Sequence, residues 1–207
     1  MKQVYIHGLG QTPDSWNKVI SQLNVTEYSI CPKLAELVKG KEVTYQNLYS
    51  SFSALCNESS ESVSLCGLSL GGVLALNYAI DHPEKVNRLI LIATQYKMPK
   101  KLLKFQNVIF RVMPKSMFHQ MGFKKDDFFK LCKTMMELDF SKSLQKVCCP
   151  TLVVCGEKDK ANKNASIELA NLLSNATLQE IDGAGHEVNE ETPKRLANVI
   201  DTFFKMG

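Results

Sequence analysis

The sequence contains no apolar run that approaches the ~20 residues a membrane-spanning helix needs. Its start also lacks the apolar stretch of a secretory signal peptide, because Met1-Lys2-Gln3 leads directly into the short run Val4-Tyr5-Ile6. We therefore expect a cytoplasmic protein that forms no stable association with a membrane.

Sequence patterns for metal binding and for disulfides are absent too. The chain has no Cys-x-x-Cys pair and no cluster of Cys and His at zinc-ligand spacing, so we expect no bound metal. It has seven cysteines, an odd number, of which Cys148 and Cys149 are adjacent while Cys31, Cys66 and Cys155 lie in apolar runs. This pattern favours reduced thiols over a disulfide framework.

The net charge is low, at +4, and does not predict nucleic-acid binding. It is unevenly distributed, however: residues 98–146 carry eleven Lys or Arg against four acidic residues, a net +7, and also hold six of the eight Met and seven of the ten Phe. We interpret this segment as an inserted subdomain. Its Phe and Met either wall an apolar pocket or form a small core of their own, and its basic residues either attract an anionic ligand or surface or are simply solvated.

The remaining residues, 1–97 and 147–207, alternate short apolar runs with helix-like stretches, which is typical of a parallel sheet with helices on both faces. A length of 207 residues suits one domain. We predict an α/β fold, a three-layer α/β/α domain with a mostly parallel sheet of six strands. The predicted helices cover 12–23, 42–57, 70–81, 163–174 and 192–204, and the predicted strands are Val4–Ile6, Glu27–Cys31, Ser62–Cys66, Arg88–Ala93, Thr151–Cys155 and Thr177–Ile181.

A Gly-x-Ser-x-Gly motif, Gly67-Leu68-Ser69-Leu70-Gly71, lies between a predicted strand and a predicted helix. In this context a serine sits on a tight, strained turn with its hydroxyl exposed, and the flanking glycines are needed because a Cβ atom there would collide with neighbouring chain. The helix that follows directs its free N–H groups at the serine. Ser69 is therefore a candidate nucleophile, although a glycine-rich turn that merely packs closely would give the same motif.

A serine nucleophile needs a base, and the base needs a carboxylate to orient it. His186 follows the last predicted strand in a glycine-rich loop, and we assign it as the base; the alternative is a surface histidine. Asp159 follows the preceding strand, and we assign it as the carboxylate. Its competitors are Glu157, Asp182 and Glu187.

The loop after the first strand, His7-Gly8-Leu9-Gly10, can supply a backbone donor for a developing oxyanion. We assign the two donors to the N–H groups of Leu9 and Leu70. His7 is expected to make a structural hydrogen bond beneath the loop rather than to act as a second base.

Four segments together resemble the α/β-hydrolase superfamily over nearly the whole chain: His7-Gly8-Leu9-Gly10, Gly67-Leu68-Ser69-Leu70-Gly71-Gly72, Gly156-Glu157-Lys158-Asp159 and Gly183-Ala184-Gly185-His186. The resemblance implies that Ser69 is the nucleophile, His186 the base and Asp159 the acid. It further implies that the Leu9 and Leu70 amides form the oxyanion hole, and that no cofactor is required.

Two departures from the superfamily pattern affect the expected fold. The chain starts at what is usually the third strand, so the two leading strands are expected to be missing. Residues 98–146 stand where the superfamily has its lid, between the sixth and seventh family strands, so a short helical lid inserted in a core of residues 1–97 and 147–207 is expected to set substrate choice.

These residues predict hydrolysis of an ester-like bond through an acyl-enzyme, and a carboxylesterase is our first interpretation. A thioesterase, a lactonase or a carbon–carbon bond hydrolase would use the same residues. A small-molecule receptor that binds without turnover is the alternative from another class. The expected partner is a small-molecule substrate with an apolar or acyl moiety, and the expected assembly is a monomer or a homodimer.

Overall fold

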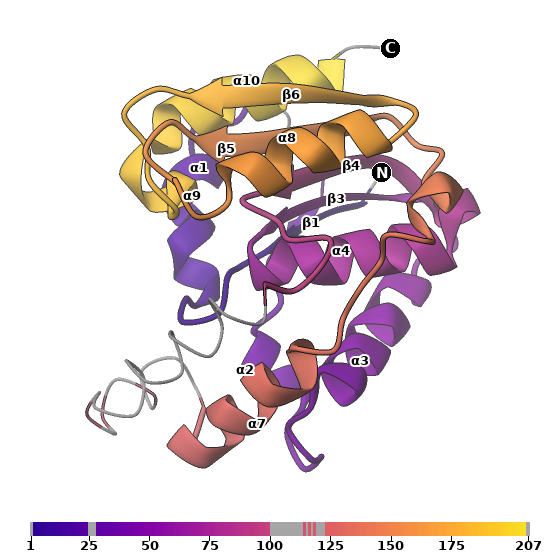
Figure 1. Cartoon of the computed structure of the whole chain (residues 1–207), viewed down its shortest axis with the longest axis vertical. Coiled ribbons are helices and arrows are strands. Elements are labelled where there is room, and N and C mark those ends of the chain that lie inside the picture. The colour runs from indigo at the N-terminus through magenta and orange to yellow at the C-terminus, as the bar shows by residue number, and fades with distance from the viewer. Residues whose placement is uncertain are drawn as a thin grey trace.

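The computed structural model describes residues 2–24, 28–99, 114, 116, 118 and 123–205. Within these residues the chain forms a six-stranded sheet in which every pair of neighbouring strands is parallel (Figure 1). In sheet order the strands are β2 (Ser29–Ile30), β1 (Lys2–Ile6), β3 (Val63–Leu68), β4 (Val86–Ile92), β5 (Thr151–Gly156) and β6 (Ala176–Ile181). The predicted six-stranded sheet is confirmed. The strand predicted over 27–31 is shorter than expected, and residue 27 lies outside the described part of the chain.

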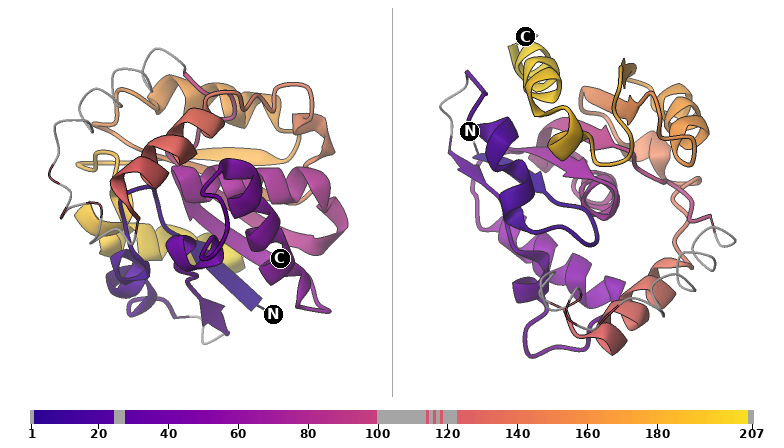
Figure 2. Two further views of the ribbon diagram at one scale, coloured as in Figure 1. Left: turned by 90° about the horizontal axis from the view of Figure 1, so that it is seen from below. Right: turned by 90° about the vertical axis from the view of Figure 1, so that its left-hand side faces the viewer.

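Helices cover both faces of this sheet (Figures 1 and 2). Side chains alternate between faces along a strand, so that Val4 and Ile6 of β1 enter one apolar cluster and Tyr5 enters the other. The first cluster includes residues of α2 (Leu34–Leu37), α3 (Tyr45–Asn57), α4 (Leu70–Asp81) and α8 (Lys163–Leu172). The second includes residues of α1 (Asn17–Ile20), α9 (Val188–Glu191) and α10 (Pro193–Lys205). The predicted three-layer α/β/α architecture is therefore confirmed.

The observed helices differ from the predicted ones mainly at their starts. The helix expected over 42–57 begins at Tyr45, because the hydroxyl of Thr44 accepts a hydrogen bond from the Asn47 amide (3.2 Å) and caps it. The helix expected over 12–23 is a short 3₁₀ helix, Pro13–Trp16, followed by the single turn α1. The one-turn helices α2 and α9 were not predicted, because four residues are too few to show a helical period.

The segment 98–146, expected to form a lid, leaves and rejoins the core through two chain segments that lie side by side. The Met98 amide donates to the Leu138 carbonyl (3.1 Å) and the Phe140 amide donates to the Tyr96 carbonyl (2.9 Å). Between them Lys97 and Asp139 form an antiparallel bridge and an ion pair of 3.4 Å. We call these paired segments, 95–98 and 138–140, the neck. Much of the segment itself, residues 100–113, 115, 117 and 119–122, lies outside the described residues.

The described helix of this segment, α7 (Lys125–Met135), packs against α3. The amide of Tyr45 at the start of α3 donates to the Thr134 hydroxyl (2.9 Å). The aromatic rings of Phe118 and Phe128 meet edge to face with centroids 5.1 Å apart, and both side chains are buried. Together with Phe123 they join the same apolar cluster as α3 and α4, so these three Phe side chains contribute to the core of the domain.

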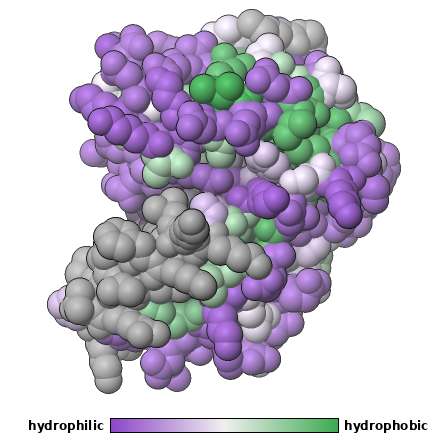
Figure 3. Space-filling model, viewed as in Figure 1, coloured by the Kyte–Doolittle hydropathy of each residue, from purple (hydrophilic) through white to green (hydrophobic). Residues whose placement is uncertain are grey.

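The face of the molecule in Figure 3 is mainly hydrophilic, with hydrophobic side chains scattered over it. Large hydrophobic side chains that are exposed in the described chain are few: Tyr28, Ile167, Leu172 and Leu178. Among the described helices, none has the length and apolar character to cross a membrane.

Candidate active site

Ser69 lies at the sharp turn where β3 ends and α4 begins. Its backbone has φ 52° and ψ −114°, a left-handed conformation that a residue with a side chain adopts at a cost of about 1–3 kcal/mol. The turn is held in place because the Ser69 amide donates to the Ile92 carbonyl at the end of β4 (2.8 Å). The hydroxyl does not cap α4, and the side chain is half-buried, so it remains available at the carboxyl edge of the sheet.

The flanking glycines make this turn possible. A Cβ atom on Gly67 would collide with the backbone of Gly71, and a Cβ atom on Gly71 would collide with the carbonyl of Ile6 in β1. The sequence-based prediction that both positions exclude a side chain is confirmed. These close approaches press the start of α4 against two strands, which fixes where Ser69 is presented.

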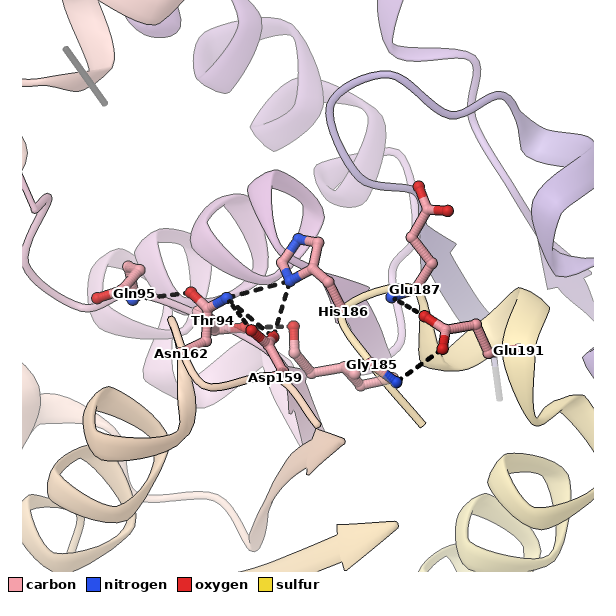
Figure 4. Close-up of polar contacts among 9 residues, drawn as sticks. Thr94, Gln95, Asp159, Asn162, Gly185, His186, Glu187 and Glu191 are labelled. Carbon is pink, nitrogen blue, oxygen red and sulfur yellow. Dashed lines mark hydrogen bonds and ion pairs between the residues drawn. The ribbon is translucent and has the colours of Figure 1, made fainter. Parts of the chain in front are cut away.

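His186 and Asp159 come together at the same edge of the sheet, from the loops after β6 and β5 (Figure 4). The His186 Nδ1 atom lies 2.9 Å from the Asp159 Oδ2 atom. The Asp159 side chain is only 4% exposed whereas that of His186 is 42% exposed, so the carboxylate is covered while the imidazole reaches solvent. In Figure 4 the second ring nitrogen of His186 points away from Asp159, and it has no hydrogen-bond partner within the described residues.

The Asp159 carboxylate receives a second donor that the sequence analysis missed. The Asn162 Nδ2 atom lies 2.9 Å from Oδ1 and 2.8 Å from Oδ2 of Asp159. Burial acts to raise the pKa of Asp159, but the hydrogen bonds from His186 and Asn162 outweigh it and hold that pKa below its usual value. The carboxylate is therefore ionised at neutral pH. A carboxylate that orients and stabilises an imidazolium must be in this state.

None of the three competing carboxylates contacts the ring of His186 within the described residues. Glu157 accepts a hydrogen bond from the Gly183 amide (2.8 Å), and Asp182 lies 3.8 Å from Arg195 in an exposed ion pair. Glu187 is exposed, and its pKa is raised by partial burial and by the neighbouring Glu190. Asp159 is the carboxylate that contacts the ring of His186.

A second residue missed from the sequence, Glu191, fixes the loop that carries His186. Its carboxylate accepts hydrogen bonds from the amides of Gly185 (2.7 Å) and Glu187 (3.0 Å), on either side of the histidine (Figure 4). Glu191 is five positions after His186, in α9, and nothing in its sequence neighbourhood distinguishes it from a solvated glutamate. Only the fold of the loop shows that it acts as a clamp.

The loop after β1 turns tightly over the end of the sheet. The Gln11 amide donates to the Gly8 carbonyl (3.2 Å), and Gly10 has φ 96°, which a residue other than glycine adopts only with strain. Leu9, at the crest of this turn, uses its N–H for no hydrogen bond within the described residues. Leu70 provides the first amide of α4, which has no acceptor inside the helix. Both predicted oxyanion donors are thus without an acceptor in the part of the chain that the structure describes.

His7 has a structural place beneath this loop, as the sequence predicted. Its Nδ1 lies 2.9 Å from the Gly8 carbonyl and its Nε2 accepts from the Leu34 amide (3.2 Å), so both ring nitrogens are used. Burial lowers its pKa, and the Gly8 carbonyl only partly opposes this. A neutral, buried imidazole with no free nitrogen is not available as a second base.

A buried hydrogen-bond network connects this loop to the loop of His186. The Gln11 side chain accepts from the Gly8 amide (3.1 Å) and donates to the Asn189 side chain (3.2 Å). Asn189 is fully buried in α9 and also donates to the Ser15 carbonyl (3.2 Å). The two loops are therefore held relative to each other by buried polar groups.

Cys66, three residues before Ser69, is buried in β3, and burial raises the pKa of its thiol well above the usual value. A thiol in that position is a core group and a poor nucleophile. No group of three or more His, Cys, Asp or Glu side chains able to hold a metal ion occurs in the described residues.

The arrangement of sheet, turn and loops matches known proteins. The enol-lactonase from Burkholderia xenovorans LB400 superposes with a TM-score of 0.80 over 98% of this chain and 90% of that chain, at 17% sequence identity. The family described as serine aminopeptidase, S33, matches residues 38–140, a range that includes Ser69. The chain belongs to the α/β-hydrolase superfamily.

Two curated proteins are similar to this α/β-hydrolase in sequence. One is the pimeloyl-[acyl-carrier protein] methyl ester esterase of Aromatoleum aromaticum, 35% identical over 91 residues, which are 44% of this chain and 36% of that protein. The other is the alpha/beta hydrolase domain-containing protein VTE7 of Arabidopsis thaliana, 29% identical over 175 residues, covering 67% of this chain and 52% of that protein. The chain thus matches about a third of the first relative's length and about half of the second's.

Proposed function

We propose that this α/β-hydrolase is a serine esterase that cleaves a carboxylic ester through a covalent acyl-enzyme. Ser69 would be the nucleophile, His186 the general base and Asp159 the carboxylate that orients the imidazole. The observation that carries this proposal is the contact of 2.9 Å between His186 and a buried, ionised Asp159, at the sheet edge where Ser69 follows β3.

The proposed reaction proceeds in two halves. His186 Nε2 takes the proton of Ser69 as its Oγ attacks the ester carbonyl, and the imidazolium then gives that proton to the leaving alcohol. Water, deprotonated by the same nitrogen, attacks the acyl-enzyme and releases the acid and free Ser69. The N–H groups of Leu9 and Leu70 would stabilise the oxyanion in both halves, since Leu70 follows Ser69, the Gly8 backbone next to Leu9 approaches Leu68, and neither N–H has an acceptor among the described residues.

The described residues contain no hydrogen bond between the Ser69 hydroxyl and His186. Such bonds are often long in a free enzyme and shorten when substrate binds. The proposal therefore includes a small closing movement of the His186 ring, for which the exposed side of that ring leaves room.

Substrate choice is part of the same proposal. We propose that segment 98–146 acts as the lid and that the substrate is a small molecule with an apolar or acyl moiety. The neck supports the lid assignment because its first segment, 95–98, follows β4 at the sheet edge where Ser69 and His186 lie, and 138–140 pairs with it there. A cytoplasmic location and a monomeric or homodimeric state complete the proposal.

The test compares three proteins on a panel of p-nitrophenyl esters from acetate to long acyl chains. We expect turnover by the unaltered protein and its loss in Ser69→Ala. Ser62→Ala is the matched control, because Ser62 is an exposed serine at the other end of β3 and should keep full activity. Absence of turnover on every ester would contradict the proposal and direct attention to thioester or carbon–carbon bond substrates. Turnover retained by Ser69→Ala would contradict the role of Ser69 as nucleophile.

A further inference from the structure

The side-chain amide of Asn162 lies in the middle of a chain of polar contacts that ends on His186 (Figure 4). Its Nδ2 atom donates to the Asp159 carboxylate, at 2.9 and 2.8 Å from the two oxygens, and lies 3.1 Å from His186 Nδ1. Its Oδ1 atom accepts from Gln95 Nε2 (2.8 Å). Asn162 is buried, so these contacts are shielded from water.

Asn162 occupies a position at which asparagine usually does something else. It is the N-cap of α8, where an asparagine side-chain oxygen normally accepts from an amide of the first helical turn. Here the side chain makes no capping bond. The oxygen that would cap the helix is turned toward Gln95 instead, and the amide nitrogen is turned toward Asp159. This orientation gives α8 no capping hydrogen bond, but it gives the Asp159–His186 pair an additional donor.

We propose that Asn162 is a positioning residue for the Asp159–His186 pair and that Gln95 fixes the direction of its amide. The inference rests on the role of that pair in the proposed esterase. Asn162 does not reach the reacting atoms; it acts through the carboxylate, keeping it ionised and aimed at the imidazole.

The direction of the Asn162 amide matters because its two ends are opposite in polarity. With Nδ2 toward Asp159, the carboxylate has donors from both neighbours; with Oδ1 there, it would face an acceptor. Gln95 matches the first arrangement, because its Nε2 donates to Oδ1 on the other side. Gln95 also lies at the start of the neck, so the base of segment 98–146 is connected by side chains to the carboxylate.

The first test is the pH dependence of ester hydrolysis. Asn162→Ala removes one hydrogen bond to a charged group, and we expect kcat to fall about 10- to 100-fold with little change in KM. The acidic limb of the kcat/KM profile should move to higher pH. The reason is that the Asp159 carboxylate, with one donor fewer, holds the proton that it shares with His186 Nδ1 more tightly. Asn164→Ala is the control: an exposed asparagine of the same helix, with no role in the site.

Two further variants distinguish positioning from simple loop support. Asn162→Asp keeps the shape but places a second carboxyl group beside Asp159, so the acidic limb should move further to higher pH than in Asn162→Ala. Gln95→Glu should turn the Asn162 amide around and move the limb in the same direction, while Gln95→Met, which only removes the donor, should have a smaller effect. A merely structural role for Asn162 predicts lower thermal stability with an unchanged profile.

The second test needs no substrate. In ¹³C-labelled protein the Asp159 carboxyl should titrate at higher pH in Asn162→Ala than in the unaltered protein and in Asn164→Ala. An identical titration in all three would overturn the positioning role, even if every protein hydrolyses esters. If Asn162→Ala does not fold, Gln95→Glu carries the same test. If the unaltered protein hydrolyses none of the esters, the proposed esterase activity is contradicted. The titration of Asp159 then still tests whether Asn162 positions the carboxylate.

Discussion

Replacing Asp159 by asparagine tests the electrostatics of the site most sharply, because it changes the charge and hardly the shape. In the native site the carboxylate oxygens accept from two donors, His186 Nδ1 and Asn162 Nδ2. An amide at this position brings an NH₂ group against one of those donors, whichever way it turns. One hydrogen bond is then lost, and the other no longer reaches a charged group. Because each hydrogen bond to the charged group contributes about 1.5–3 kcal/mol, the two changes together cost up to about 3–6 kcal/mol.

Because about 1.4 kcal/mol corresponds to a tenfold change in rate, Asp159→Asn should lower kcat by about 10²- to 10⁴-fold at pH 7. The assay is initial-rate hydrolysis of the best p-nitrophenyl ester, with Ser69→Ala as the blank. KM should change little, since Asp159 is buried and does not contact substrate. An Asp159→Asn variant that retains more than a tenth of the kcat would refute this reasoning.

The same variant has a predicted pH signature in stability. The pKa of Asp159 is lowered in the folded protein from a reference value of 3.8, so its contribution to the free energy of unfolding is complete above that pH and is lost as the pH falls further. The unaltered protein should therefore be more stable than Asp159→Asn in urea at pH 7, by about 1–3 kcal/mol. The difference in free energy of unfolding between the two proteins should shrink at pH 3. A difference that stays constant with pH would contradict this role of the Asp159 charge.

Three other predictions follow from packing and exposure. Gly71→Ala should destabilise the fold by at least about 3 kcal/mol in thermal or urea unfolding, because its Cβ atom meets a backbone carbonyl of β1; Gly40→Ala, with φ 75° but open space around it, should cost only about 1 kcal/mol. Glu191→Gln should lower kcat several-fold with little loss of stability, because it weakens the clamp on the His186 loop; equal kcat would show that the clamp is not needed. Iodoacetamide at pH 8 should modify Cys148, the exposed cysteine, before the other six, and Cys148→Ser should abolish the fast phase.

The sheet and the strand-to-helix turn could be predicted from the sequence because their determinants are local. The buried strands β3 and β5, for example, are short apolar runs that end at a glycine or within one residue of it. The two glycines that flank Ser69 are required by contacts within a few residues or with the adjacent strand. The loop positions of Asp159 and His186 then follow from the rule that parallel strands bring their carboxyl ends to one edge.

The supporting residues could not be predicted, because their roles depend on tertiary contacts. Asn162, Glu191 and Asn189 are ordinary polar residues in or beside helices, and only the folded chain brings them to Asp159, to the His186 loop and to Gln11. The composition of segment 98–146 did not decide where its many Phe side chains lie, because they could line an apolar pocket or form a core. The described rings pack against α3 and α4, an outcome that no local pattern specifies.

The central claim is that Ser69 is a nucleophile activated by His186, and reaction with a fluorophosphonate probe tests it most directly. The account predicts a single adduct by intact-mass spectrometry, located on the peptide that contains Ser69. The adduct should be absent in Ser69→Ala, strongly slowed in His186→Ala and unchanged in Ser62→Ala. No adduct on the folded protein, or an adduct that persists in Ser69→Ala, would contradict the account.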